Sequence, residues 1–404
     1  MEEWKEYKAT DFCKNVTDGT HDSPKQKSKG YYLITSKHIK GNTIDFDSAY
    51  KISEEDYNKI IQRSKVDQWD VIISMIGAYC GFCYLEKSTK TDYAIKNVGL
   101  FKVGSEIKSK WLYYYLTSPA GQYKLHLLRT GSSQPYIALN SLRNITIPVP
   151  DEKTMRSIVS VLQSLDEKIE VNMRINDNLE QQAQALFKSW FVDFEPFKDQ
   201  PFVESELGMI PQGWRVGTLG EICTQSSVKV GIRNNIKVLS PVTAGCLMLS
   251  EDYFTKQVFS ESIAKYKVVE RGAFAYNPAR VNIGSLGRNE FDFDGCVSPV
   301  YVVFVCKDSY ANYFDLFRAT ERFKTEVSLR AIGGVRQSLN FIDFAMIQTI
   351  IAPKDVVDAF NPLIEKLKVA KKHLDNESRR LAELRDTLLP RLMSGELSVN
   401  DIKE

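Results

Sequence analysis

The sequence lacks the hallmarks of several large functional classes. No run approaches the ~18 apolar residues of a membrane span, and the first residues lack the basic and then apolar pattern of a signal peptide. No Gly-x-x-x-x-Gly-Lys-Ser/Thr loop for nucleotide phosphates is present. Glycine (22) and proline (14) are few among 404 residues, which excludes fibrous and low-complexity chains. We therefore expect a folded cytoplasmic protein without a nucleotide-driven motor of its own.

Residues for metal or redox chemistry are also sparse. Seven cysteines are an odd number in a chain without an export signal, which favours reduced thiols. Cys80 and Cys83 have the spacing of half a zinc site, but no second pair follows, and the four histidines are scattered. We expect this cysteine pair to lie in a buried strand and predict no metal site.

The excess of positive charge is small. A net charge of +2 and a pI near 8.0 do not by themselves indicate a nucleic-acid-binding protein. Any surface for a polyanion must therefore come from local clusters of basic residues.

The chain contains an internal repeat with a shift of about 203 residues. This shift pairs Gly81 with Gly284, Gln134 with Gln337 and Pro150 with Pro353. Each half has a Trp nine residues before a Cys, short β-rich segments, an aromatic helix (expected around 109–127 and 310–327), a turn with Gly and Gln, and an Ile-rich strand. The order of these features, more than the sparse identities, predicts two similar α+β domains.

A long helix follows each Ile-rich strand. Apolar residues recur every three or four positions, a heptad pattern typical of helices that pair. Roughly 38 residues make a rod of about 57 Å, longer than one domain needs, so the two helices are expected to pair with each other. Packing of each helix on its own domain is the alternative. The residues expected at the pairing seam are Leu162, Leu165, Ile169, Asn172, Asn176, Leu179, Leu367, Leu374, Leu381 and Leu384.

Three connecting segments resemble those of a known family. They are Leu186 to Phe197 (LFKSWFVDFEPF), Leu207 to Trp214 (LGMIPQGW) and Leu388 to Leu397 (LLPRLMSGEL). Asp18 to Pro24 (DGTHDSP) adds a fourth similarity near the start. Together they resemble the specificity subunits of type I restriction-modification systems, in order and over essentially the entire chain.

The resemblance implies two target-recognition domains with irregular twisted β-sheets, joined by two long antiparallel coiled-coil-like helices with a pseudo-twofold internal repeat. Such a subunit reads a split, asymmetric site in double-stranded DNA, one half per domain. It recruits two methyltransferase subunits, which bind S-adenosylmethionine, and restriction subunits can join. No cofactor is expected in this chain, and no base preference transfers because recognition domains vary widely within the family.

The expected domain boundaries follow the repeat. They are a first recognition domain at 1–150, a first spacer helix at 151–191, a linker at 192–213, a second recognition domain at 214–353, a second spacer helix at 354–394 and a tail at 395–404. A rigid spacer would fix the separation of the two recognition domains in base pairs.

Candidate DNA contacts are Arg, Lys, Asn, Gln and Ser on loops, because these side chains reach base edges and phosphates. In the first domain they are Lys25, Lys27, Lys29, Tyr31, Arg129, Ser132, Ser133 and Gln134. In the second domain they are Arg233, Asn234, Asn235, Lys237, Asn277, Arg280, Asn282, Arg330, Arg336 and Gln337. Ordinary solvated turns are the alternative for each loop.

A catalytic role is the main competing hypothesis. Asn277-Pro278-Ala279 resembles the motif of adenine methyltransferases but lacks its second proline and aromatic residue, and no Phe-x-Gly-x-Gly cofactor loop occurs. Asp151 and Glu152 are expected to cap the first long helix rather than to bind a nuclease metal. We therefore expect a non-catalytic subunit. A stand-alone methyltransferase or nuclease, or a scaffold without sequence specificity, are the alternatives.

Overall fold

A computed structural model describes residues 4–233, 235–254, 260, 262–307, 309–331 and 338–399. The chain divides into two compact units. The first consists of residues 1–172 and 375–404, and the second of residues 173–374. Among the described residues, no helix is long and apolar enough to cross a membrane.

The first unit is built on two small sheets. One has the order β2-β8-β5-β6 and the other β4-β3-β7, while β1 pairs with β9. Their bounds are β1 Lys5–Lys8, β2 Asn15–Asp18, β3 Tyr31–Thr35, β4 Lys51–Ile52, β5 Val71–Ser74, β6 Cys83–Leu85, β7 Tyr93–Lys96, β8 Val98–Lys102 and β9 Thr146–Val149. Helices connect and cover them: α1 Ala9–Phe12, η1 Ser36–His38, α2 Glu54–Ser64, α3 Glu106–Thr117, α4 Pro119–Leu127 and α5 Leu139–Asn144.

The second unit repeats this order. Its four-stranded sheets are β13-β20-β17-β18 and β15-β14-β19-β16, β12 pairs with β21, and a hairpin β10-β11 precedes them. The strands are β10 Phe202–Ser205, β11 Gly208–Pro211, β12 Arg215–Thr218, β13 Cys223–Ser226, β14 Lys237–Pro241, β15 Leu247–Leu249, β16 Lys267–Val269, β17 Phe274–Tyr276, β18 Leu286–Arg288, β19 Gly295–Val297, β20 Val302–Cys306 and β21 Gln348–Ile351. The short helices are η2 Glu195–Phe197, α7 Leu219–Ile222, α8 Ser250–Tyr253, η3 Val281–Ile283, α9 Tyr310–Phe317, α10 Glu321–Arg330 and α11 Phe341–Ala345.

The internal repeat is confirmed by strand pairing. The parallel pair β3–β7 of the first unit has its counterpart in the parallel pair β14–β19 of the second. The antiparallel pair β5–β8 corresponds to β17–β20, and β1–β9 corresponds to β12–β21. The predicted α+β class with two similar halves is therefore correct.

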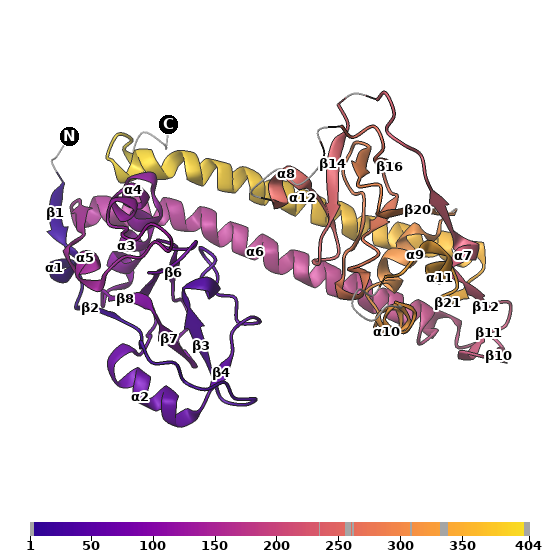
Figure 1. The fold of residues 1–404 in the computed structure, drawn as a ribbon, viewed down its shortest axis with the longest axis horizontal. Helices are drawn as coiled ribbons and strands as arrows, with labels where there is room; N and C mark the ends of the chain where they lie inside the picture. Colours follow the sequence, from indigo (N-terminus) through magenta and orange to yellow (C-terminus); the bar gives the residue numbers. More distant parts are fainter. Residues whose placement is uncertain are drawn as a thin grey trace. The chain divides into compact units, whose positions relative to one another are not determined.

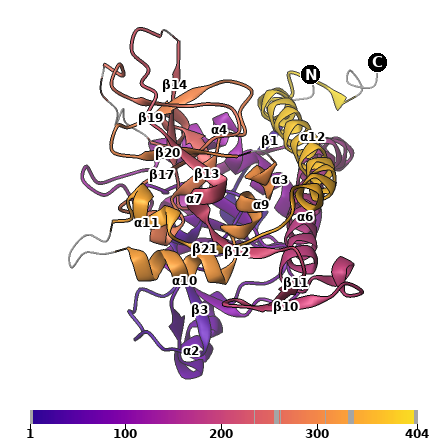
Figure 2. The ribbon, with the colours of Figure 1, turned by 90° about the vertical axis from the view of Figure 1, so that its right-hand side faces the viewer.

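Two helices of 40 residues, α6 Glu152–Phe191 and α12 Lys354–Met393, contribute to both units. Figures 1 and 2 show α6 (magenta) and α12 (yellow) side by side within each unit. Asp151 caps α6, because its Oδ1 accepts hydrogen bonds from the amides of Lys153 (2.9 Å) and Thr154 (3.1 Å). The capping role expected for this acidic pair is confirmed at Asp151.

The aromatic helix expected in each half is interrupted. In the first unit it divides into α3 and α4, because Pro119 cannot continue α3 and Ser118 caps the new helix by accepting from the Gly121 amide at 3.2 Å. In the second unit Thr320 Oγ1 accepts from the Phe323 amide at 3.3 Å and begins α10. The prediction of one continuous helix was wrong in both halves. Tyr114 and Tyr115 of α3 are buried in the core of the first unit.

The segment between α6 and the second sheet is packed rather than extended. Phe191, Phe194, Phe197 and Trp214 are buried. The Phe194 and Phe197 rings contact the Trp214 ring edge to face, and the Phe191 ring is tilted against it. Residues of the expected linker, such as Phe194 and Phe197, therefore form part of the hydrophobic core of the second unit.

Candidate nucleic-acid interface

Two turns of the first unit form one continuous surface. The turn between β5 and β6 (77–82) and the turn at 129–136 are joined by backbone hydrogen bonds, from Gly77 N to Pro135 O at 2.8 Å and from Ile137 N to Met75 O at 2.9 Å. Arg129 ties them further, because its Nη2 donates to the Cys80 carbonyl at 2.7 Å. We call this the first turn surface.

Except for Arg129, the predicted donors of the 129–136 turn are exposed to solvent. Thr130 and Tyr136 exchange two backbone hydrogen bonds of 2.9 Å, which closes the turn, and Gly131 supplies the left-handed residue it needs (φ 85°). Ser132, Ser133 and Gln134 are exposed at its tip. Small polar side chains held on a closed turn are suited to hydrogen bonding with an external partner.

The lysine loop has a different environment. Lys25, Lys27 and Lys29 are exposed, and the Lys27 amide donates to the Lys51 carbonyl at 2.8 Å. Tyr31 stacks on Tyr57 of α2 with ring centroids 3.9 Å apart. The three cations are thus presented to solvent, whereas the Tyr31 ring is committed to packing.

The loop before β14 is the most exposed segment of the second unit that sequence reasoning selected. Arg233, Asn235 and Lys237 are exposed beside the almost wholly exposed Ile232. Asn235 has a left-handed backbone (φ 61°), and the Lys237 ammonium lies 5.2 Å from the centre of the Phe293 ring. Asn234 lies outside the described residues.

The turn between β17 and β18 is the counterpart of the β5–β6 turn. Asn277 Oδ1 accepts from the Ala279 amide at 3.0 Å, so this side chain stabilises its own turn. Arg280 and Asn282 are exposed. The Leu339 amide donates to the Pro278 carbonyl at 3.1 Å, which joins this turn to the segment that follows α10. We call the β17–β18 turn and the adjoining residue Leu339 the second turn surface.

Arg330 is engaged within the second unit. It pairs with Glu326 on the preceding turn of α10. Arg336 and Gln337 lie outside the described residues. Apart from Arg330, the predicted contacts that the structure describes lie on the two turn surfaces and two further loops, and their role remains a prediction.

Sequence reasoning missed part of the first turn surface. Tyr79 and Phe82 of the β5–β6 turn contact each other edge to face with centroids 5.6 Å apart, and the Lys40 ammonium lies 3.8 Å from the centre of the Tyr79 ring. The signal was present, since the repeat aligns Gly81 with Gly284 of the β17–β18 turn. The expectation that Cys80 and Cys83 lie in a buried strand is confirmed for Cys83, the first residue of β6, but is wrong for Cys80, which is buried within the β5–β6 turn. That expectation drew attention away from the turn.

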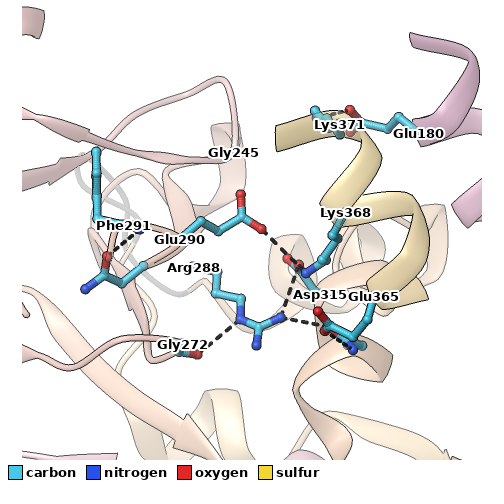
Figure 3. A network of polar contacts seen from close by, with 12 residues as sticks. Glu180, Gly245, Gly272, Arg288, Glu290, Phe291, Asp315, Glu365, Lys368 and Lys371 are labelled. Carbon is cyan, nitrogen blue, oxygen red and sulfur yellow. Dashed lines mark hydrogen bonds and ion pairs between the residues drawn. The ribbon is translucent and has the colours of Figure 1, made fainter. Parts of the chain in front are cut away.

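A network of charged side chains joins the sheet β13-β20-β17-β18 of the second unit to α9 and α12 (Figure 3). The Asp315 carboxylate on α9 accepts from Lys368 of α12 (2.6 Å) and from Arg318 (2.8 Å), and Arg288 of β18 lies at 3.9 Å. Arg288 also donates to Asn312 at 2.8 Å. Burial raises the pKa of Asp315, but the cations of Arg318, Lys368 and Arg288 outweigh it and hold this pKa well below its usual range.

A smaller network of polar contacts joins helices of the first unit. Asp166 of α6 accepts from the Tyr114 hydroxyl of α3 and from Arg385 of α12, both at 2.8 Å. Burial lowers the pKa of Arg385, yet hydrogen bonds to Asp166 and Asp386 raise it overall. Each unit therefore anchors an aromatic helix to the long helices through an aspartate.

Antiparallel pairing of the long helices is visible inside each unit. In the first, Asn172 donates to Glu377 at 2.8 Å and Lys168 lies 3.3 Å from Glu377. Together with the Asp166–Arg385 pair, residue numbers fall along one helix as they rise along the other. In the second unit Glu180 pairs with Lys371 at 2.8 Å.

The seam residues differ in their burial. Leu162, Asn172 and Asn176 are buried, whereas Leu384 is 47% exposed. The remaining seam residues are half-buried: Leu165, Ile169, Leu179, Leu367, Leu374 and Leu381. Asn172 donates to Glu377 and Ser378, the kind of polar contact that fixes helix register.

The described part of the chain contains no group of three or more His, Cys, Asp or Glu side chains arranged to hold a metal ion. Burial raises the pKa of Cys13 and Cys296 to about 12 in each case, with Asp70 adding to the effect at Cys13. Such thiols are inert rather than nucleophilic.

Known proteins share this architecture. Residues 1–181 match the family described as the type I restriction modification DNA specificity domain. The chain is 28% identical over 318 residues to the type I restriction enzyme MjaIX specificity subunit of Methanocaldococcus jannaschii, covering 73% of this chain and 71% of that protein. It is 23% identical over 343 residues to the HindI specificity subunit of Haemophilus influenzae, covering 65% and 71%.

A solved structure agrees in fold. The crystal structure of a type I restriction-modification system S subunit from M. genitalium superposes with a TM-score of 0.52 at 14% identity, and the match covers 96% of each chain. The sequence matches and the duplicated fold agree with the resemblance carried by the connecting segments. In sequence and in fold, the chain is therefore similar to the specificity subunits of type I restriction-modification systems.

Proposed function

We propose that this chain reads a bipartite, asymmetric site in double-stranded DNA, with one recognition domain for each half-site. The observation that carries the proposal is the repetition of a surface. In each unit, the turn after an inner strand (β5 or β17) is joined by a backbone hydrogen bond to a second polar segment. Two such surfaces on one chain suit a target with two different halves, because their side chains differ.

The recognition domains are proposed to span 1–150 and 214–353, with the spacer helices at 151–191 and 354–394, the linker at 192–213 and the tail at 395–404. The helices α6 and α12 have 40 residues each, about 60 Å at ~1.5 Å per residue. A stiff pair of helices makes the number of base pairs between half-sites a fixed property of the protein. Half-site spacing is therefore expected to change when whole helical turns are inserted in both helices.

The chemistry is proposed to belong to partners. Two methyltransferase subunits would bind S-adenosylmethionine and transfer the methyl group, and restriction subunits could join the complex in the cytoplasm. This chain would supply sequence recognition alone, since its sequence contains no Phe-x-Gly-x-Gly cofactor loop.

Reconstitution tests this division of labour. The purified chain is incubated with labelled S-adenosylmethionine and DNA, first alone and then with its methyltransferase subunits. We expect no transfer by the chain alone and methylation at one split site by the complex. Methyl transfer by the isolated chain would favour the competing hypothesis of a stand-alone methyltransferase, and methylation without sequence preference would favour a scaffold.

Individual contacts can be tested at Arg280, which is exposed on the second turn surface. Arg280→Ala is expected to weaken binding of the complex to its target by ~1 to 3 kcal/mol, the range for a good base or phosphate contact. Arg330→Ala is a useful comparison, because Arg330 pairs with Glu326 within the unit. Unchanged affinity of a folded Arg280→Ala variant would remove this side chain from the interface.

A further inference from the structure

The first turn surface has an aromatic and cationic feature that the proposed contacts do not include. Phe82 is 39% exposed and Tyr136 is 46% exposed, although both belong to segments fixed by backbone hydrogen bonds. Lys40 is exposed above Tyr79 of the same turn. A positive charge beside exposed rings is a combination suited to DNA, whose phosphates attract the cation while thymine methyl groups and sugars offer apolar contacts.

The Phe82 side chain is held in position before any partner arrives. Its amide donates to the Tyr79 carbonyl at 2.9 Å, its carbonyl accepts from the Ser74 amide at 2.8 Å, and its ring lies edge-on against Tyr79. Gly81 precedes it with φ 94°, a backbone that a side chain would strain. Little conformational entropy is therefore lost when the ring makes a contact.

The neighbouring polar groups belong to the other segment of the same surface. Ser132, Ser133 and Gln134 are exposed on the 129–136 turn, which the Gly77–Pro135 and Ile76–Tyr136 backbone pairings hold against the β5–β6 turn. In the second unit, the counterpart of the β5–β6 turn places an apolar side chain, Ile283, beside Arg280 and Asn282. An exposed apolar residue near hydrogen-bonding residues is thus present on both turn surfaces.

We infer that the β5–β6 turn contacts the DNA half-site read by the first unit, with Phe82 making an apolar contact to a base edge in the groove and Lys40 contacting a phosphate. This inference rests on the proposed function and adds two residues to it. Phe82 would contribute to specificity, whereas Lys40 would contribute affinity without regard to sequence.

The test uses the complex of the full chain with its methyltransferase subunits, and a duplex that carries the sequence this complex methylates. Phe82→Ala should weaken binding about fivefold without changing the salt dependence, because the exposed part of an aromatic ring would no longer be buried. Lys40→Ala should weaken binding and reduce the slope of log affinity against log salt by about one, because one phosphate contact is lost.

Matched controls separate these effects from general damage. Tyr7→Ala removes an aromatic ring of almost equal exposure (40%) from β1, and Lys90→Ala removes an exposed cation from the loop after the other end of β6. Both should bind within twofold of the wild type. Phe82→Leu keeps an apolar side chain and should retain more affinity than Phe82→Ala, while thermal unfolding verifies that each variant is folded.

The outcomes distinguish this inference from the proposed function. If the wild-type complex does not prefer its target over a scrambled duplex, the proposed function fails. If the wild type is selective but folded Phe82→Ala or Lys40→Ala binds as tightly and with the same salt slope, the β5–β6 turn lies outside the interface and the inference is overturned. Should Phe82→Ala fail to fold, Lys40→Ala carries the test, because Lys40 is exposed and its loss leaves the core intact.

Discussion

Replacing Asp315 by asparagine removes the one negative charge that three cations share in the second unit. The Asp315 side chain is only 10% exposed, and Arg288, Arg318 and Lys368 are each about one-fifth to one-quarter exposed. Asparagine keeps the shape and one hydrogen-bond acceptor but removes the countercharge that Arg288 and Arg318 share, and it leaves Lys368 with the exposed Glu290. Removing one partner of a buried ion pair typically costs ~3 to 5 kcal/mol.

The lower end of that range, about 3 kcal/mol, is expected here because the amide oxygen still accepts a hydrogen bond and the cations are partly solvated. For a unit of roughly 200 residues this corresponds to a fall in Tm of about 6 to 12 °C. Differential scanning calorimetry and urea unfolding of the wild type and the variant measure it. Glu290→Gln is the matched control, because Glu290 is mostly exposed and lies 3.5 Å from the same Lys368, and it should change stability by less than about 0.5 kcal/mol.

A small effect would refute this reasoning. If Asp315→Asn and Glu290→Gln unfold at the same temperature, the ion pairs of Asp315 do not stabilise the packing of the sheet β13-β20-β17-β18 on α12. The attachment would then depend on the apolar contacts of α12, such as those of Phe360 and Ile364, and on the hydrogen bonds of Asn312.

Three further predictions follow from the same packing and charges. Because the pKa of Asp315 is depressed, its stabilisation is present above the ordinary aspartate pKa of about 3.9 and is lost as the pH falls below that value. The urea midpoints of the wild type and Asp315→Asn should therefore differ by a constant amount from pH 7 to 5 and converge below about pH 4. A constant difference down to pH 3 would contradict this prediction. Leu162→Ala, at a wholly buried position, should cost ~2 to 5 kcal/mol, whereas Leu384→Ala should cost less than about 1 kcal/mol, and equal unfolding midpoints would argue against the burial of the seam. Cys246 is the exposed thiol among the seven, so a thiol reagent should label it first and Cys246→Ser should abolish the fast phase, unless another cysteine is labelled at that rate.

Much of the architecture could be predicted from the sequence because it depends on periodicity. The repeat, the two long helices and their antiparallel pairing are encoded by apolar residues every three or four positions and by the same order of segments in each half. The polar seam residue Asn172 was also identifiable, and it contacts Glu377 as a register-fixing residue would.

The finer structure depends on contacts that a linear sequence does not reveal. Ser118 and Thr320 interrupt the aromatic helices through caps formed by single hydroxyl groups. Leu384 fits the heptad pattern but is exposed. A straight α-helix has 3.6 residues per turn, so residues at a strict seven-residue spacing rotate gradually away from the partner helix. The Asp315 network could not be foreseen, since its cations come from β18, the end of α9 and α12.

The candidate interface, too, could be predicted from the sequence only in part. Sequence patterns identified the polar loops at 129–134, 231–237 and 277–284, because Gly and Asn beside basic residues are visible locally. Which segments these loops contact is decided by tertiary hydrogen bonds, such as the one from Leu339 to Pro278. The β5–β6 turn with Phe82 was overlooked because its flanking cysteines are buried and its aromatic residues suggest a core.

The most direct test of the account is the pattern of methylated adenines in the host genome, read by single-molecule sequencing in the parent strain and in a strain that lacks this chain but keeps the methyltransferase subunits. The account predicts methylation at one bipartite sequence with a fixed spacer in the parent and its complete loss in the deletion strain. Methylation that persists unchanged at the same sequence without this chain would contradict its role as the subunit that reads DNA.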